Sequence, residues 1–91
     1  MPKPLMTIEN WGVVQSFLSQ SFEELRPGNR LLGYVLGHAS LPNTKPVCTS
    51  TIVRVDLSQR LVETRNTVYQ LGKASVEYRS WAHSQAARSA A

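Results

Sequence analysis

The most constraining feature of this sequence is a run of β-branched residues between residues 47 and 57. Such side chains are stiff at χ1, which suits them to the pleated surface of a sheet better than to a helix. The run contains Thr49, Thr51, Ile52, Val53 and Val55. Alternation places Thr51, Val53, Val55 and Leu57 on one face, and Ile52, Arg54 and Asp56 on the other. The pattern predicts a β-strand over residues 47–57.

A tight connection, Ser58-Gln59-Arg60, follows this strand and leads into residues 61–71. Two such segments joined by a short link are typical of a β-hairpin, so we expect them to pair antiparallel. Residues 61–71 form either one long strand or two strands broken at Arg65-Asn66, because asparagine tolerates left-handed backbone geometry. Gly72 ends the sheet in both cases.

One more strand is expected before the β-branched run. Residues 31–36 are short and apolar, and they include Tyr34 and Val35, which favours a buried strand. Together with the two alternatives for residues 61–71, this strand makes a sheet of three or four strands. Residues 38–46 contain two prolines and form the longest expected loop, of a kind that often carries binding residues.

The N-terminal part of the chain predicts a helix. Thr7 can cap it, and Glu9 in the first turn favours the positive end of the helix dipole. Apolar residues recur every three or four positions: Trp11, Val14, Leu18, Phe22 and Leu25. Val13 and Phe17 widen this stripe, which is expected to be buried in the core. Gly12 costs about 1 kcal/mol relative to alanine inside a helix. Either the helix starts raggedly there, or another group packs close to that glycine. The sequence from Arg26 to Asn29 ends the helix.

The last element is a short C-terminal helix. Ser75 can cap it, and its small apolar face consists of Val76, Tyr78, Trp81 and Ala82. Residues 84–91 have nothing to bury and are expected to fray or to be disordered.

We therefore predict one α+β domain over residues 7–83, between a flexible lead at residues 1–6 and a tail at residues 84–91. In this domain a curved antiparallel sheet packs against the N-terminal helix and is flanked by the C-terminal helix. A partly open SH3-like barrel is a variant of this architecture.

The length of 91 residues limits the function classes. A chain of this size buries roughly 60–65% of its unfolded surface, which allows a core but leaves little room for a deep, walled active site. The single cysteine, Cys48, has no partner for an intramolecular disulfide, and the N-terminus lacks the pattern of a signal peptide. The longest nearly apolar stretch, residues 31–37, is far shorter than the ~20 residues of a membrane span. We expect a cytoplasmic protein.

Charge is distributed unevenly along the chain, whose net charge is +4. Residues 1–25 hold one lysine and three glutamates, a sum of −2, whereas residues 26–91 hold nine basic and three acidic residues, a sum of +6. This excess permits attraction to nucleic acid or to an acidic protein surface, although a solvated surface is the simpler explanation.

No catalytic, metal-binding or cofactor-binding motif is present. His38 is the best placed titratable side chain and Cys48 follows ten residues later, but no spacing signature marks a Cys-His nucleophile pair. Cys48, His38 and His83 lack the paired spacing of a zinc site, and no glycine-rich phosphate loop occurs. Glu23 and Glu24 are adjacent, so they point to different faces. We expect a protein that is not an enzyme and that needs no cofactor.

The basic residues of the hairpin region are the candidate partner-binding residues. They are Arg54, Arg60, Arg65 and Lys73, with Lys45 from the preceding loop and Tyr69 as an exposed ring among them. Such a patch is compatible with nucleic-acid binding. Asp56 and Glu63 interrupt the hairpin, however, and no RNP-type aromatic motif occurs.

Protein recognition is the remaining function class. The chain has residues that suit it, because Trp, Tyr and Arg are enriched at binding hot spots. Trp11 and Trp81 are expected in the core, one on each helix. Tyr69, Arg65 and the loop residues Asn43, Thr44 and Lys45 are better surface candidates.

Residues 49–53 (TSTIV), followed by residues 63–72 (ETRNTVYQLG), resemble a pattern in short uncharacterised proteins of bacterial tailed phages and prophages. The resemblance covers at most residues 31–72, and it transfers no functional residue. It implies a setting in the bacterial host, where small phage accessory proteins commonly act by occupying a surface of a host protein. Inhibitors of CRISPR–Cas surveillance complexes are one such class, linked here by analogy.

The leading hypothesis is therefore a non-catalytic accessory protein, a monomer or homodimer, that binds a host protein or complex stoichiometrically. A small basic nucleic-acid-binding domain is the alternative.

Overall fold

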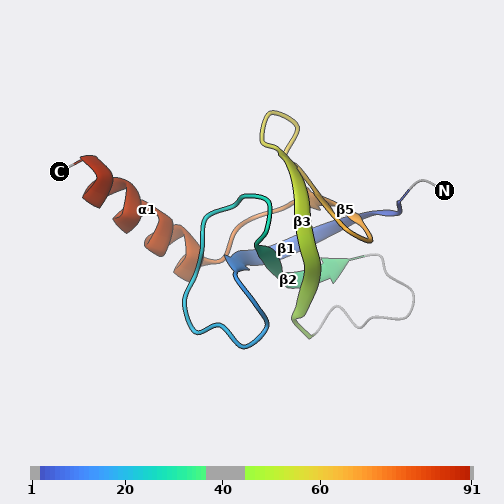
Figure 1. The fold of residues 1–91 in the computed structure, drawn as a ribbon, viewed down its shortest axis with the longest axis horizontal. Coiled ribbons are helices and arrows are strands. Elements are labelled where there is room, and N and C mark those ends of the chain that lie inside the picture. Colours follow the sequence, from blue (N-terminus) through green and yellow to red (C-terminus); the bar gives the residue numbers. More distant parts are fainter. Residues whose placement is uncertain (1–2, 37–44, 91) are drawn as a thin grey trace.

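The computed structural model describes residues 3–36 and 45–90, which form a closed five-stranded barrel and one helix. The elements are β1 (Leu5–Val14), β2 (Arg30–Leu36), β3 (Val47–Asp56), β4 (Leu61–Thr64), β5 (Val68–Leu71) and α1 (Val76–Ala90). Each strand pairs antiparallel with the next one in the chain, and β1 closes the barrel by pairing parallel with β5 (Figure 1). The predicted α+β class is confirmed, and the sheet closes fully instead of staying partly open.

The predicted N-terminal helix is wrong: residues 5–14 form β1, which has strand neighbours on both sides. A β-bulge between Glu9 and Gly12 explains why the apolar spacing resembled a helix. Asn10 sits there at φ 50°, in the left-handed region that asparagine tolerates. The extra residue changes the strand's alternation, so Ile8 and Trp11, three residues apart, are both buried.

Residues 15–29, the second half of the predicted helix, form a long loop between β1 and β2. The loop is held to the end of β1, because the Glu23 amide donates to the Val13 carbonyl at 2.8 Å. Phe17 and Leu18 were expected on a buried stripe but are 76% and 82% exposed.

The other predicted strands are confirmed at residues 31–36 and 47–57, within one residue at their ends. Residues 61–71 divide into two strands at Arg65-Asn66, as in the second alternative. The Thr64 amide donates to the Thr67 carbonyl at 2.8 Å, and the Thr67 amide donates to Thr64 Oγ1 at 3.2 Å. The sheet has five strands instead of three or four because β1 joins it.

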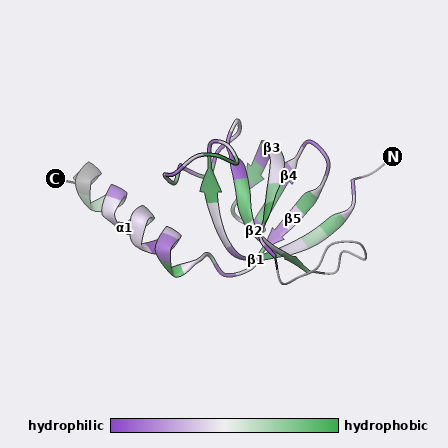
Figure 2. Ribbon diagram, turned by 90° about the horizontal axis from the view of Figure 1, so that it is seen from below, coloured by the Kyte–Doolittle hydropathy of each residue, from purple (hydrophilic) through white to green (hydrophobic). Residues whose placement is uncertain are grey.

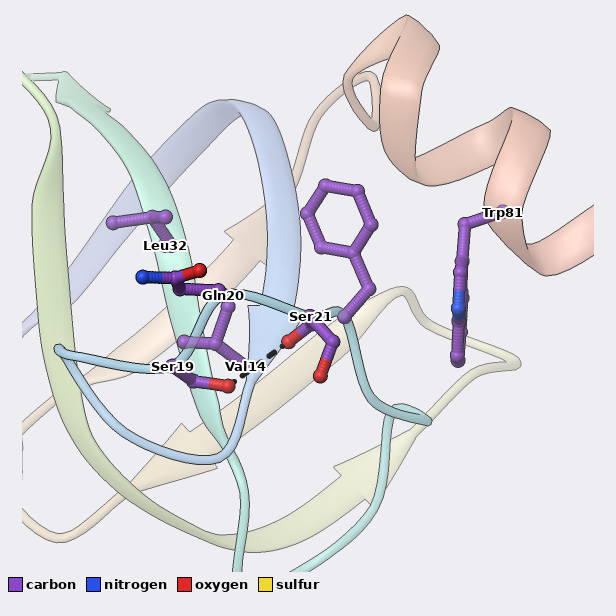
Figure 3. Close-up of a pocket in the computed structure, with 7 residues that line it drawn as sticks. Val14, Ser19, Gln20, Ser21, Leu32 and Trp81 are labelled. Carbon is purple, nitrogen blue, oxygen red and sulfur yellow. Dashed lines mark hydrogen bonds between the residues drawn. The ribbon is translucent and has the colours of Figure 1, made fainter.

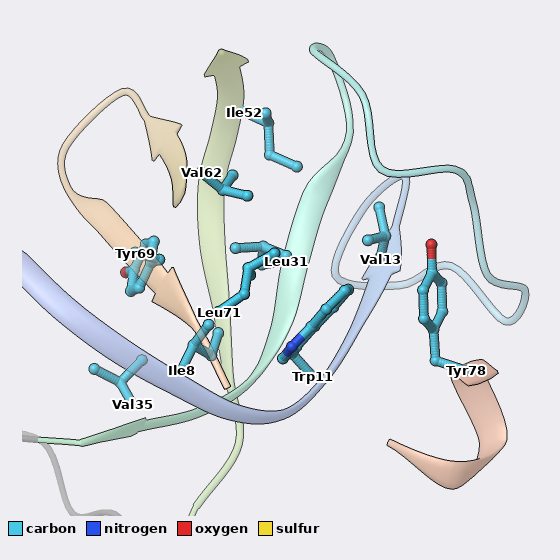
Figure 4. Close-up of a cluster of buried hydrophobic side chains, with 10 residues drawn as sticks. All are labelled: Ile8, Trp11, Val13, Leu31, Val35, Ile52, Val62, Tyr69, Leu71 and Tyr78. Atoms are coloured by element: carbon cyan, nitrogen blue, oxygen red, sulfur yellow. The ribbon is translucent and has the colours of Figure 1, made fainter. Parts of the chain in front are cut away.

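The core fills the barrel interior (Figure 4). Its least exposed members are Ile8, Val13, Leu31, Val35, Ile52 and Val62, all at 2% exposure or less. Trp11 is buried as expected, although on a strand, and its indole N–H donates to the Gly72 carbonyl at 3.0 Å. Tyr69 was expected to expose its ring, but only 7% of the residue is exposed. Tyr69 alternates inward with Leu71 on β5, which is why it belongs to the core.

Close packing explains why a glycine occupies position 12, which is the second of the two alternatives. A Cβ at this position would lie 3.1 Å from the Phe22 ring and 3.4 Å from the Tyr78 Cβ. The loop and α1 therefore both approach β1 at this residue, so a larger side chain here would push one of them away.

α1 begins as predicted after Ser75, whose Oγ accepts a hydrogen bond from the Tyr78 amide at 3.0 Å. It runs to Ala90, across most of the segment expected to be a disordered tail. Figures 1 and 2 show α1 extending away from the barrel, while Tyr78, near the start of α1, packs on Trp11 of β1. Among the described residues, no helix is long and apolar enough to cross a membrane.

Candidate protein-interaction surface

An aromatic cluster joins α1 to the loop after β1. Tyr78 lies between three other rings, with centroid distances of 5.5 Å to Trp11, 5.3 Å to Phe22 and 5.6 Å to Trp81. Phe22 and Trp81 also meet edge-on at 6.2 Å. Such geometries are favourable for aromatic pairs, so the cluster sets the position of α1 on the barrel.

Three adjoining pockets run along this junction, and we call them together the α1 groove. The first holds about 340 Å³ and is lined by Val14, Ser19, Gln20, Ser21, Phe22, Leu32 and Trp81 (Figure 3). In Figure 3, Trp81 reaches down from α1 at one end of this pocket while Leu32 lies at the other. The second pocket shares Phe22 and Leu32 with the first, and the third shares Trp81 with it.

The second pocket holds about 240 Å³ and is lined by Asn10, Gly12, Phe22, Leu32, Gly33, Tyr34, Pro46, Ser75 and Glu77. The third holds about 300 Å³ and is lined by Glu24, Leu25, Tyr78, Trp81, Ala82, Gln85 and Ala86. The charged residues that line the α1 groove, within the described part of the chain, are therefore two glutamates.

The exposed pair Phe17 and Leu18 directly precedes Ser19, Gln20 and Ser21, which line the first pocket. These residues are the central positions of a turn in which the Ser19 amide donates to the Ser16 carbonyl at 3.0 Å. The Ser19 hydroxyl donates to the Ser21 carbonyl at 3.1 Å, which ties the turn to the wall of the first pocket. Burying a Phe or Leu side chain is worth about 1.5–3 kcal/mol, so leaving two neighbours exposed forgoes this stabilisation at both positions.

The structure does not gather the predicted basic residues into one patch. Lys45, Arg54, Arg60, Arg65 and Lys73 are all exposed, as expected. Arg60 and Arg65 stand at opposite ends of β4, roughly 16 Å apart at the rise of an extended chain. The Arg60 guanidinium donates hydrogen bonds to the backbone carbonyls of Leu71 (3.2 Å) and Gly72 (2.5 Å).

Acidic neighbours reduce the positive charge of the hairpin further. Arg54 is paired in register with Glu63 on β4, and both Arg54 and Asp56 line the same pocket. Glu63 also accepts a 2.6 Å hydrogen bond from Lys3, and this ammonium lowers the pKa of the carboxyl. The Ser58 hydroxyl lowers the pKa of Asp56 in the same way, so both carboxylates are charged near neutral pH.

The residues considered for catalysis are not assembled into a site. Cys48 is half-buried on β3, and burial raises the pKa of its thiol, which opposes a role as nucleophile. His38 lies outside the described residues. Among the residues that are described, no three His, Cys, Asp or Glu side chains lie together as metal ligands. Glu24 is exposed at the groove, and Glu23 contributes its backbone carbonyl to α1.

The candidate surface was missed in the sequence because its residues were assigned to a helix. Serines at positions 16, 19 and 21 surround Phe17, Leu18 and Phe22, and serine competes with helical hydrogen bonding. That serine pattern was the available signal of a loop. No protein-family model, curated protein or solved structure matches the chain.

Proposed function

We propose that this protein is a non-catalytic binding protein that recognises another protein through the α1 groove and the Phe17–Leu18 turn. The observation that carries the proposal is the exposure of these two large apolar side chains beside an apolar groove. Exposed apolar patches of this kind mark interaction sites, and aromatic side chains serve as anchors in them.

The fold suits stoichiometric binding. A closed barrel has no unpaired strand edges, and the aromatic cluster holds α1 and the loop against it, so the surface is preorganised. A small domain can present about 800 Å² to a partner, the usual share of a stable interface. The resemblance to phage proteins makes a bacterial host protein or complex, including a defence complex that the protein inhibits, the partner class we propose.

The test is affinity capture from bacterial lysate with matched variants. The immobilised protein is compared with the double variant Phe17→Ser/Leu18→Ser and with Leu57→Ser as the control. Leu57 is also an exposed leucine, at 65%, but it lies on the turn between β3 and β4. We expect a nuclease-resistant, stoichiometric protein complex that the double variant loses and the control keeps.

Two outcomes would contradict the proposal. Equal capture by the double variant would remove the Phe17–Leu18 turn from the interface. Recovery of mixed nucleoprotein that disappears after nuclease treatment would instead favour the alternative, a basic nucleic-acid-binding domain, whose affinity must fall steeply with salt.

A further inference from the structure

We propose that the α1 groove accepts a basic segment of the partner protein, in which an arginine lies against Trp81 and an adjoining apolar side chain enters the pocket between Val14 and Leu32. This inference rests on the proposed function and names the chemistry of the partner at the same surface. Three features of the groove carry it: its charge, its aromatic wall and the two pockets that Trp81 lines.

The charge of the groove is opposite to that of the chain. The protein carries a net charge of +4, yet the charged residues lining the groove in the described ranges are Glu24 and Glu77. The nearest cations in sequence are Lys45, Arg26 and Arg79, each next to a lining residue, and none of them lines the pockets. Interfaces place charges of opposite sign against one another, so the two lining carboxylates complement a basic side chain inside the groove.

The two glutamates belong to different parts of the groove: Glu24 lines a pocket together with Trp81, whereas Glu77 lies four residues before Trp81 on α1. Glu77 lines the second pocket and Glu24 lines the third, while Trp81 borders both the first and the third. The Glu24 carboxylate is close enough to the aromatic cluster to help raise the pKa of Tyr78. A cation beside Trp81 therefore has a carboxylate within reach.

The aromatic wall favours arginine over other side chains. Trp81 is half-buried, and it stacks on Tyr78 at an interplanar angle of 28°. Tryptophan is the strongest cation–π partner among the aromatic side chains. A planar guanidinium can stack on the indole while its N–H groups pair with a carboxylate, which an ammonium does less well.

The apolar part of the segment fits the first pocket. Its walls include Val14, Phe22 and Leu32, and its volume of about 340 Å³ lies within the range of pockets that hold ligands. Trp81 lines the same pocket as Val14 and Leu32, so a side chain adjoining the arginine can occupy it.

The experiment is a ¹H–¹⁵N NMR titration of the full chain with three pentapeptides: N-acetyl-Ser-Leu-Arg-Leu-Ser-amide and its versions with norleucine or glutamate in place of arginine. The two indole N–H signals provide an internal control. Trp81 belongs to the groove, whereas the Trp11 N–H is bonded to the Gly72 carbonyl. We expect the Trp81 signal to shift, with the arginine peptide binding about 3- to 30-fold more tightly than the norleucine peptide.

Variants separate the role of charge from that of shape. Glu24→Gln and Glu77→Gln should each weaken the arginine peptide about 2- to 5-fold and leave the norleucine peptide unchanged. Asp56→Asn, which removes a carboxylate at the far turn, is the control and should change neither. Trp81→Leu should abolish the preference for arginine while retaining the fold, checked by thermal melting.

Several outcomes would overturn the inference. If the glutamate or norleucine peptide binds as tightly as the arginine peptide or more tightly, a basic segment is excluded as the occupant of the groove. The absence of any shift of the Trp81 signal at millimolar peptide excludes it too. Concentration-dependent shifts of groove signals without peptide identify a second copy of the chain as the occupant.

Experiment can distinguish a failure of this inference from a failure of the proposed function. If lysate capture depends on Phe17 and Leu18 but not on Glu24, Glu77 or Trp81, the protein still binds a partner through the turn, and only the assignment of the arginine is wrong.

Discussion

The hydroxyl of Tyr78 donates a 2.9 Å hydrogen bond to the backbone carbonyl of Glu23, across 55 residues of sequence. This bond ties α1 to the loop that carries Phe17, Leu18 and Phe22. The same ring packs on Trp11, Phe22 and Trp81. Tyr78 is therefore the residue through which the barrel, the loop and the helix hold one another in place.

Tyr78→Phe removes the hydrogen bond and keeps the ring contacts. A partly buried carbonyl loses its donor, so we expect the free energy of unfolding to fall by about 1 kcal/mol. For a domain of this size that is a decrease in Tm of about 4–8 °C, measured by circular dichroism. An unchanged Tm would show that the bond to Glu23 contributes nothing to the attachment of α1.

The pH dependence of stability offers a second test of Tyr78. Burial, with a smaller contribution from the Glu24 carboxylate, raises the pKa of Tyr78 to about 12 from an ordinary value of 10. The folded state therefore holds this proton more tightly than the unfolded state. The stabilisation is complete below pH 10 and is lost as the pH rises towards 12.

Urea unfolding between pH 9 and pH 12 measures this loss. Tyr78→Phe should show a smaller decline than the wild type over this range. Burial also raises the pKa of Tyr69, which remains in both proteins, so a residual decline is expected in the variant. Identical declines in the two proteins would contradict the role assigned to Tyr78.

Two glycines on the barrel should differ in their tolerance of alanine. At Gly33, a Cβ would lie 3.0 Å from the Glu9 carbonyl oxygen and the Trp11 Cα, which are backbone atoms of β1 that cannot move independently. At Gly72, the Cβ would overlap the Glu9 carboxylate, the end of a flexible side chain. We expect Gly33→Ala to cost about 1–3 kcal/mol, the range of overpacking, and Gly72→Ala to cost less.

The cost at Gly72 has a specific cause that a double variant can isolate. The Glu9 carboxylate accepts a 2.7 Å hydrogen bond from the Lys73 amide, and alanine at position 72 displaces it. In the Glu9→Ala background, Gly72→Ala should therefore cost nothing further in chemical denaturation. A cost that stays the same in that background would place the strain elsewhere.

The exposed apolar pair should be dispensable for folding. Phe17→Ser/Leu18→Ser should change the free energy of unfolding by no more than about 0.5 kcal/mol per site, because neither side chain is buried. Phe22→Ala, by contrast, removes a ring packed on Tyr78 and Trp81 and should cost at least about 2 kcal/mol. A large loss of stability in the double variant would mean that the pair has a structural role.

The Cys48 thiol should react slowly. Its pKa is raised by burial, with opposition from the Arg30 guanidinium, so the thiolate is scarce at neutral pH. Alkylation by iodoacetamide should be slower in the folded protein than in urea, as followed by mass spectrometry. Faster reaction in the folded state would reopen the question of a reactive cysteine.

Local patterns were sufficient to indicate every element except β1. The β-branched run predicts β3 because its preference does not depend on distant residues, and the short link at residues 58–60 predicts the hairpin with β4 for the same reason. Arg65-Asn66 allowed the break between β4 and β5, and the Ser75 cap marked the start of α1. All of these signals are contained within a few neighbouring residues.

The candidate site could not be predicted in this way. Its wall combines the loop after β1, the outer side of β2 and α1, which are brought together by contacts such as that between Phe22 and Trp81. The basic residues chosen from the sequence were exposed as expected, but β4 separates two of them and acidic neighbours surround another.

The sequence by itself therefore determined the α+β class, three strand segments and the start of the final helix. Only the tertiary structure decided that residues 5–14 form a strand, because the hydrogen-bond partners of that strand are remote: Leu5 pairs with Val68, and Thr7 with Leu36. The bulge at Asn10 gave the strand a spacing that also fits a helix, and barrel closure resolved the choice. Because β1 ends at Val14, residues 15–29 form a loop, and Phe17 and Leu18 are exposed on its surface instead of being buried in the core.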